Sequence, residues 1–419
     1  MPNCCHYPVL SLSPRQNWVS KAGRKTMTDT GIQAPKGALL DAPGKAKKAE
    51  APMIAQVAKE YGVSPFRQMR EIFTMRRGAQ KLSGPEYYSL RLFDPAKSPE
   101  DKRAFLGQAG VNALNASMNP PVAVPTRAFV GNKLLYTQLL TQLGIATPKT
   151  QALVSGFRDA GQLPVLRDAA AVATFLRNDA TYPLFGKPHH GSLSEGSVRI
   201  ASRKGDGLRL GNGKVLNVET FAAEVMERFP GGFLFQDALS PDPDMAMIAG
   251  AAVGCVRVVT ANDGGGPKPA YAVWKLPAPD AMSDNFWQAG SLLAHLDLQT
   301  GEVLTCVRGT GLKAEAIPDH PTSGQPVVGV KLPHWAETLK IAQDAHAVFP
   351  EFGVCGFDIA VTADGPAIIE CNDNPSHMLY QIAAARGVTN PDLARVWEAV
   401  AARQARQVAR IQAAGKAAK

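Results

Sequence analysis

Three polar side chains interrupt two otherwise apolar runs near the end of the chain. Asp358 lies in the run 356–362, and Glu370 and Asn372 lie in the run 367–372. Each run has the composition of a β-strand, and burying an unpaired carboxylate there costs several kcal/mol. A cation that shares these oxygens would remove that cost. The alternative is that the same residues line the solvated edge of a sheet.

The turn between the two strands decides whether the three side chains share one face. A two-residue loop would place Asp358 on the face opposite to Glu370 and Asn372. Such a loop requires residue 366 to donate a backbone hydrogen bond, and Pro366 has no N–H. We therefore predict a three-residue loop, 364–366, which sets Asp358 opposite Asn372 with Glu370 two residues away on the same face.

Two carboxylates and one amide oxygen on a shared face are hard ligands. They suit Mg²⁺ held between a protein and a nucleotide, with Mn²⁺ as an alternative ion. Such an ion neutralises the charge that develops on a transferred phosphoryl group. The pattern therefore predicts a metal-assisted phosphate chemistry.

A loop of small residues follows a short strand that ends near Lys187. Backbone N–H groups of such a loop can turn toward one anion, and the lysine adds a positive charge at its start. Gly/Ser loops also commonly just connect the strands of a hairpin. The members of this candidate phosphate lid are Gly191, Ser192, Ser194, Glu195 and Gly196.

A strand end and two strand-borne cations complete the candidate site. The apolar strand at 232–235 runs into residues 236–239, which could bind a purine edge and ribose hydroxyls or could simply enter a polar loop. Arg257 and Lys275 each interrupt an apolar strand, where an isolated cation is costly unless it meets an anion. Phosphate oxygens or a substrate carboxylate would meet that need.

Hydrophobic periodicity indicates the elements that must position these residues. Apolar residues recur at helical spacing over 53–77, with a break at Gly62 and Pro65. In the second of these helices the apolar positions are Phe66, Met69, Ile72 and Phe73. We predict a leader and linker over 1–52, a helical N-terminal region over 53–130 and a C-terminal helix with a basic tail over 391–419. Between them, short β-branched runs alternate with helices and turns, which indicates an α+β or α/β core.

Composition excludes several classes of protein. The 419-residue chain has a formal charge of +9, but many basic residues lie near its ends with few aromatics, which argues against nucleic-acid binding. No apolar stretch approaches the roughly 20 residues of a membrane-spanning helix. The six cysteines show no CxxC pair, a pattern typical of reduced thiols in a cytoplasmic protein. The sequence leaves homo-oligomerisation open.

Taken in order, these segments resemble the ATP-grasp superfamily, and specifically its sugar-transfer-associated branch, over residues 86–387. The resemblance implies an α+β ATP-grasp fold in which two α+β lobes, over 131–235 and 236–390, enclose ATP. It implies that Lys133 and Lys187 approach the phosphates and adenine, that 191–196 is the lid, and that Mg²⁺ binds at Asp358, Glu370 and Asn372. The implied adenine hinge comprises Gln236, Asp237, Ala238 and Leu239, and the residues beside the γ-phosphate and acceptor are Arg257, Lys275 and Asn285.

Two positions depart from the pattern of the superfamily. The hinge has Gln236 where many relatives have glutamate. Gly356 stands where several ligases have an arginine two residues before the metal aspartate, and that arginine steadies the tetrahedral intermediate. Either Arg257 or Lys275 takes its place, or the acceptor chemistry differs from standard amide ligation.

The reaction implied by the resemblance is ATP- and Mg²⁺-dependent ligation of a small-molecule carboxylate to an amine through an acyl phosphate. The association with sugar transfer points to cell-envelope or polysaccharide-linked metabolism, by analogy at the level of the family. Two other functions remain open: an ATP-grasp phosphotransferase, and a non-catalytic ATP-binding or RNA-associated module.

Overall fold

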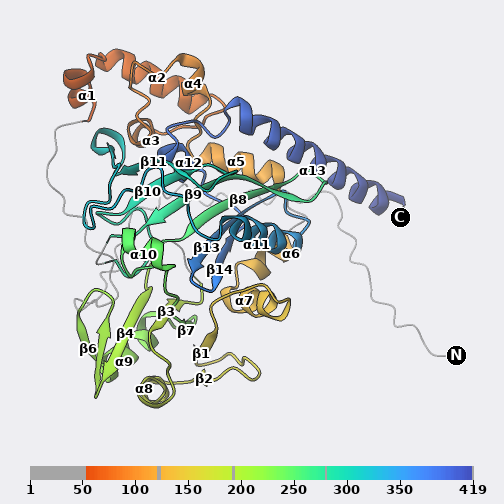
Figure 1. Cartoon of the computed structure of the whole chain (residues 1–419). Coiled ribbons are helices and arrows are strands. Elements are labelled where there is room, and N and C mark those ends of the chain that lie inside the picture. Colours follow the sequence, from red (N-terminus) through yellow and green to blue (C-terminus); the bar gives the residue numbers. More distant parts are fainter. Residues whose placement is uncertain (1–52, 120–123, 191–193, 279–280, 418–419) are drawn as a thin grey trace, which may run out of the picture. The chain divides into compact units, whose positions relative to one another are not determined.

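The computed structural model describes residues 53–119, 124–190, 194–278 and 281–417. The leader and linker predicted over 1–52 therefore lie outside the described residues. All described residues belong to one unit, which contains helices and two seven-stranded sheets (Figure 1). The prediction of an α+β fold is confirmed.

The described part of the N-terminal region is helical. Helices α1 (Met53–Tyr61) and α2 (Pro65–Arg77) are separated at Gly62, whose φ of +67° suits glycine. The Ser64 hydroxyl caps α2 by accepting a hydrogen bond from the Arg67 backbone N–H at 3.3 Å. The helices that follow are α3 (Gly84–Ser89), α4 (Pro99–Arg103), α5 (Gln108–Met118), α6 (Val124–Val130) and α7 (Lys133–Gln142).

The first sheet has the order β2-β1-β7-β3-β4-β5-β6, and only its β1–β2 pair is parallel. Helices α8 (Ala169–Asn178) and α9 (Val218–Arg228) pack on each other beside it. Its strands are β1 (Thr150–Val154), β2 (Val165–Leu166), β3 (Leu184–Pro188), β4 (Val198–Lys204), β5 (Gly207–Leu210), β6 (Val215–Asn217) and β7 (Phe233–Asp237).

The second sheet is antiparallel throughout, in the order β12-β11-β10-β9-β8-β13-β14. Helix α10 (Pro243–Ala249) precedes it, α11 (Trp335–Ala347) packs on β8, β9, β13 and β14, and α12 (Met378–Ala383) packs on β9 to β11. Its strands are β8 (Val256–Asn262), β9 (Pro267–Leu276), β10 (Leu292–Leu296), β11 (Val303–Arg308), β12 (Glu315–Ala316), β13 (Val354–Thr362) and β14 (Gly365–Asn372).

The β13–β14 hairpin differs from its predicted register. Thr362 pairs with Gly365, so the loop has two residues, and the predicted three-residue loop is wrong. A bulge after Asp358 shifts the pairing by one residue, because Ile359 pairs with Ile368 whereas Asp358 pairs with Glu370. The predicted pairing of Asp358 with Asn372 is therefore also wrong.

Despite the register error, the three side chains do share one face. The bulge compensates for the shorter loop, because it adds one residue to β14 before Glu370. Asp358 is directly opposite Glu370, and Asn372 is two residues further along β14, opposite Gly356. Side chains that alternate with period two must then point the same way.

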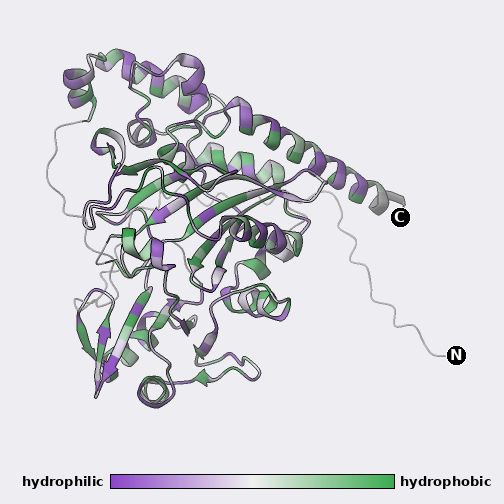
Figure 2. Cartoon of the chain, viewed as in Figure 1, coloured by the Kyte–Doolittle hydropathy of each residue, from purple (hydrophilic) through white to green (hydrophobic). Residues whose placement is uncertain are grey.

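The C-terminal helix α13 (Pro391–Ala417) begins against the body of the protein and ends exposed. Leu393, Trp397 and Val400 are buried among residues of α5 and the second sheet, and the Trp397 indole donates to the Val388 carbonyl at 2.9 Å. Figure 2 shows hydrophilic and hydrophobic residues alternating along α13, as expected for a helix packed on one side. None of the helices in the described ranges is long and apolar enough to cross a membrane.

Candidate active site

A cavity of about 290 Å³ is lined by residues of both sheets and of the segments that follow them. Most of the residues predicted from the sequence line this one cavity: Lys133, Lys187, Ser194, Glu195, Gln236, Asp237, Ala238, Leu239, Arg257, Lys275, Asn285, Asp358, Glu370 and Asn372. Gly196 does not line it, and Gly191 and Ser192 lie outside the described residues.

Strand register explains why the charged residues meet. Arg257 of β8 is directly opposite Asp358 of β13, and Val273 of β9 is opposite Arg257. Lys275 is two residues beyond Val273, so its side chain lies on the same face of the sheet as Arg257. The intervening residues, Val256, Val258 and Trp274, belong to the apolar core that includes α11. Alternation thus sends apolar side chains to one face and the charged set to the other.

The cations in these strands meet carboxylates of the protein itself. The Arg257 guanidinium donates from Nε to Asp358 Oδ1 at 2.5 Å and from Nη2 to Oδ2 at 2.8 Å. Lys275 Nζ lies 2.6 Å from Asp284 Oδ2 and 3.1 Å from Asp358 Oδ2. The sequence predicted that both cations need an anion, and in the structure Asp358 and Asp284 meet that need.

Burial and ion pairing act in opposite directions on these groups. Burial favours the neutral acid of Asp358, but Arg257 and Lys275 outweigh it and hold the pKa of Asp358 well below its usual range. Burial likewise opposes the charge of Lys275, while Asp284 and Asp358 raise its pKa. Asp358, Arg257 and Lys275 are each at least nine-tenths buried. Asp358 and Lys275 therefore stay ionised throughout the physiological pH range.

Two further lysines, Lys133 and Lys187, line the same cavity. Lys133, the first residue of α7, has its Nζ 3.4 Å from Glu370 Oε1. Lys187 on β3 is 5% exposed, and burial lowers its pKa to about 8. The positive charge of Lys133 also lowers this pKa, whereas the negative charges of Glu370 and Asp284 raise it. A buried, weakly compensated lysine of this kind favours an anionic ligand.

The donor set fits a hard divalent cation. The Asn372 side chain donates a hydrogen bond from its Nδ2 to the Gly356 carbonyl at 3.4 Å, which leaves its amide oxygen to bind a metal ion. Glu370 is the more accessible carboxylate, with a third of its side chain exposed, whereas both oxygens of Asp358 already accept from Arg257 and Lys275. Mg²⁺ is commonly held by one or two carboxylates together with substrate phosphates. Glu370 and Asn372 would therefore be its accessible ligands, with Asp358 sharing its oxygens.

The predicted adenine hinge is held from both sides by its neighbours. The Gln236 side chain is buried and donates to Thr150 Oγ1 at 3.0 Å, and Asp237 Oδ1 accepts from Gln151 at 2.6 Å. The backbone N–H groups of Asp237 and Ala238 donate to other strands and loops. The part of this segment that lines the cavity and is partly exposed comprises Asp237, Ala238 and Leu239.

Gly196 has a structural reason to be glycine. Its φ is +74°, and a Cβ at this position would lie 2.3 Å from Phe229 Cζ. The chain of the predicted lid therefore passes directly against the Phe229 ring. Neighbouring Ser194 and Glu195 do line the cavity, so Gly196 anchors the end of this loop without facing the cavity.

Asp284 lines the cavity and pairs with Lys275, but the sequence pattern did not predict it. It lies beside Asn285, which the sequence analysis names as a candidate site residue. Of the two carboxylates that bind Lys275, Asp284 is nearer than Asp358. The sequence did contain a signal for it: an acidic residue stands directly before Asn285, and the pattern already indicated that Lys275 needs an anion nearby. Arg199, Trp287, Asn374 and Ser376 also line the cavity without having been predicted.

The sequence of residues 112–396 matches the family model described as sugar-transfer-associated ATP-grasp. This match covers more than half of the chain. The chain belongs to the sugar-transfer-associated ATP-grasp family. A search of curated protein sequences found no match.

Solved structures similar to this ATP-grasp chain include several ligases. The D-alanine–D-alanine ligase from Coxiella burnetii is 16% identical, with 70% of this chain and 62% of that one covered and a TM-score of 0.40. An L-amino acid ligase from Bacillus licheniformis is 14% identical, with 65% of this chain and 48% of that one covered and a TM-score of 0.34. The ATP-grasp ligase PsnB with a minimal precursor is 15% identical, with 68% of this chain and 64% of that one covered and a TM-score of 0.34. The chain thus spans between about half and two thirds of these proteins.

The family resemblance led us to expect an arginine at the position that Gly356 occupies in this ATP-grasp chain. A Cβ at Gly356 would lie 2.7 Å from Pro375 Cβ and 3.3 Å from Arg257 Cδ. The Arg257 side chain therefore fills the space beside Gly356 that a side chain at that position would need. This geometry favours Arg257 as the substitute cation.

A Gly356→Ala variant is expected to lower the free energy of unfolding by about 1–3 kcal/mol, because the rigid Pro375 ring must move to admit the methyl group. Chemical denaturation measures the change. Gly231→Ala is the matched control, since a Cβ there meets nothing within 4 Å, and it should leave stability within about 0.5 kcal/mol of the native protein. Equal stability of the two variants would show that the contact with Pro375 is not constraining.

Proposed function

We propose that this ATP-grasp protein is an ATP- and Mg²⁺-dependent ligase that joins a small-molecule carboxylate to an amine through an acyl phosphate. The observation that carries the proposal is the shared face of β8, β9, β13 and β14. It brings Arg257, Lys275, Asp358 and Glu370 to one cavity, together with Asn372. This set can hold a triphosphate, a metal ion and a second anion together.

Each group of residues has a proposed part in the site. The first sheet with α8 and α9, and the second sheet with α11, are the two lobes that enclose the nucleotide. Lys133 and Lys187 bind phosphate oxygens, and the hinge at 236–239 binds adenine and ribose. Glu370, Asn372 and Asp358 hold Mg²⁺, which when bound neutralises charge on the phosphates.

Arg257, Lys275 and Asn285 face the acceptor side of the cavity. We propose that a carboxylate oxygen of the substrate attacks the γ-phosphorus, and that the bond to the departing ADP oxygen breaks. The amine nitrogen then attacks the acyl carbon, the bond between that carbon and the phosphate oxygen breaks, and inorganic phosphate leaves with the proton that the amine gives up as the amide forms. Arg257 has five N–H donors and uses two on Asp358, which leaves three for oxygens that become negative during these steps.

The decisive experiment measures ADP release by the purified protein against a panel of carboxylates, with and without amines. The panel includes amino acids and sugar acids, because the family description refers to sugar transfer. Hydroxylamine is added to trap an acyl phosphate as a hydroxamate. ADP together with a hydroxamate supports the ligase, whereas ADP with a stable phosphorylated product supports a phosphotransferase. If no substrate raises ADP release above that of an Asp358→Asn blank, the ligase proposal fails.

Nucleotide affinity is expected to fall as pH rises through about 8, the pKa that burial gives Lys187. Below that value the lysine carries the charge that a phosphate needs. Above it, binding must also take up a proton, so affinity falls by up to about tenfold per pH unit until the pKa of the bound state is reached. Calorimetric titration with ATP on both sides of pH 8 measures the effect. The Lys187→Arg variant, which stays charged, should show a flat profile, and an equally steep decline in that variant would assign the titration to another group.

A further inference from the structure

Helix α2 exposes three large apolar side chains, while two polar side chains and Met75 occupy its inner side. Gln68 is fully buried and Glu71 is largely covered, whereas Phe66 is 78% exposed, Met69 63% and Phe73 54%. These three apolar residues form what we call the outer stripe. The sequence periodicity correctly placed a helix here, but three of the four apolar positions used to predict it face away from the protein.

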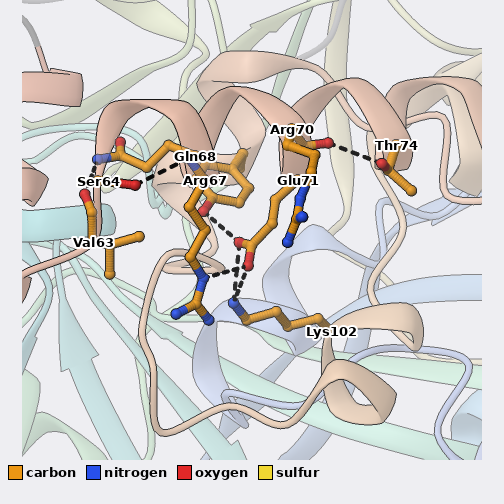
Figure 3. A network of polar contacts seen from close by, with 9 residues as sticks. Val63, Ser64, Arg67, Gln68, Arg70, Glu71, Thr74 and Lys102 are labelled. Atoms are coloured by element: carbon orange, nitrogen blue, oxygen red, sulfur yellow. Dashed lines mark hydrogen bonds and ion pairs between the residues drawn. The ribbon is translucent and has the colours of Figure 1, made fainter.

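The polar contacts of α2 fix its rotation about its own axis (Figure 3). The Gln68 amide donates to the Val63 carbonyl at 2.7 Å, and Glu71 lies 3.1 Å from Lys102 Nζ and accepts from the Tyr87 hydroxyl at 2.7 Å. Turning the outer stripe inward would strip these buried groups of their partners, which is costly for an amide and more so for a carboxylate. The stripe is therefore outside because Met75 and a satisfied polar network occupy the inner side.

Positive charge surrounds the outer stripe. At 3.6 residues per turn the three apolar residues fall within an arc of about 60°, with Arg70 and Arg77 on one side of it and Arg76 on the other. All three arginines are exposed, and the Arg77 guanidinium lies 4.0 Å from the centre of the Phe73 ring. Within residues 62–81 the one acidic residue is Glu71, and it points to the inner side. The outer side thus combines apolar side chains with charged side chains that are all positive.

The size of the stripe favours a lipid surface over a protein partner. Phe66 and Phe73 are about 10 Å apart along the helix. Two phenylalanines bury about 300–500 Å², and with Met69 added the stripe still stays below the roughly 800 Å² per partner of a stable protein interface. A helix lying in a bilayer interface needs no such area, because it inserts a narrow apolar face and leaves arginines at the headgroups.

We propose that α2 is a membrane-surface anchor for anionic lipids. The outer stripe enters the boundary between headgroups and acyl chains, and Arg70, Arg76 and Arg77 meet lipid phosphates. This inference concerns a surface remote in sequence from the cavity residues and does not depend on the proposed ligase reaction.

Sedimentation of the full chain with lipid vesicles tests the proposal. Vesicles of equal parts phosphatidylcholine and phosphatidylglycerol should carry the protein down, vesicles of phosphatidylcholine alone should not, and added salt should release it. The triple variant Phe66→Ser, Met69→Ser, Phe73→Ser should lower the partition coefficient about a hundredfold. Replacing Arg70, Arg76 and Arg77 by glutamine should lower it by a similar factor, since each arginine near an anionic surface contributes about fivefold.

A matched control removes exposed apolar side chains elsewhere. Phe157, Val215 and Leu143 are 67%, 62% and 52% exposed, close to the values of the outer stripe. Their triple serine variant should bind the anionic vesicles like the native protein. Thermal unfolding of every variant confirms that it remains folded.

Three outcomes would overturn the proposal. The first is a native protein that stays in solution with the anionic vesicles, and the second is an equal loss of binding in the matched control. The third is a native dimer that the outer-stripe variant converts to a monomer without any vesicle binding, which would assign the face to a second copy of the chain. A loss confined to the two α2 variants supports the anchor.

Discussion

An Asp358→Asn variant is expected to lose ATP-dependent turnover by about a thousandfold. Asp358 is the shared partner of Arg257 and Lys275 and lies directly opposite Glu370. Asparagine has nearly the same shape but no charge, so Arg257 loses its carboxylate partner, Lys275 keeps only Asp284, and the proposed metal site loses one carboxylate. ADP release with hydroxylamine and the most active carboxylate of the panel is the measurement.

The same substitution should also reduce stability, which must be measured separately. Removing one member of a buried ion pair leaves uncompensated charge and lowers the free energy of unfolding by about 3–5 kcal/mol. Asp392→Asn is the matched control: Asp392 pairs with Arg386 at 2.8 Å on the surface, where a pair contributes at most about 1 kcal/mol. A folded Asp358→Asn protein with native turnover would remove Asp358 from the catalytic site.

The convergence of Asp358, Glu370 and Asn372 could be predicted because carboxylates in apolar strands must share a partner. The route to it could not be predicted. Pro366 argued for a longer loop, yet the chain turns earlier, with a two-residue loop at 363–364 and Pro366 inside β14, and a bulge is added before Glu370. A bulge leaves no mark in hydrophobic alternation when the residues around it are all apolar, as Ile368 and Ile369 are.

Contacts with residues outside the element itself were the second feature that the sequence pattern could not predict. The chain pattern showed that Lys275 needs an anion, but not that Asp284 from a following loop would supply it. In α2, spacing predicted a helix correctly, but which side faces inward depends on Lys102 and Tyr87 of later helices. In both cases local pattern identifies the element, and a polar contact made elsewhere in the chain sets its role.

Replacing Arg257 by methionine is expected to lower turnover about a hundredfold while changing ATP affinity only a few-fold. Arg257 lies beside Gly356, where a family arginine is absent, and its three remaining N–H donors are proposed to act on the reacting oxygens. Arg257→Lys keeps the charge but loses the two-point bond to Asp358, so it should recover only part of the activity. Arg308→Met, which breaks an exposed arginine–glutamate pair at the edge of the same sheet, is the control and should turn over like the native protein.

The pH profile distinguishes a chemical role of Arg257 from a purely structural one. In the native protein Arg257 and Lys275 keep Asp358 ionised by holding its pKa well below the usual range. Without Arg257, burial favours the neutral acid more strongly, so the pKa of Asp358 rises and the carboxylate becomes protonated as pH falls. The methionine variant should therefore show an acid loss of turnover that the native protein and Arg257→Lys lack at the same pH. If Arg257→Met keeps native turnover at every pH, the substitute for the missing arginine must be Lys275, or the acceptor chemistry must proceed without one.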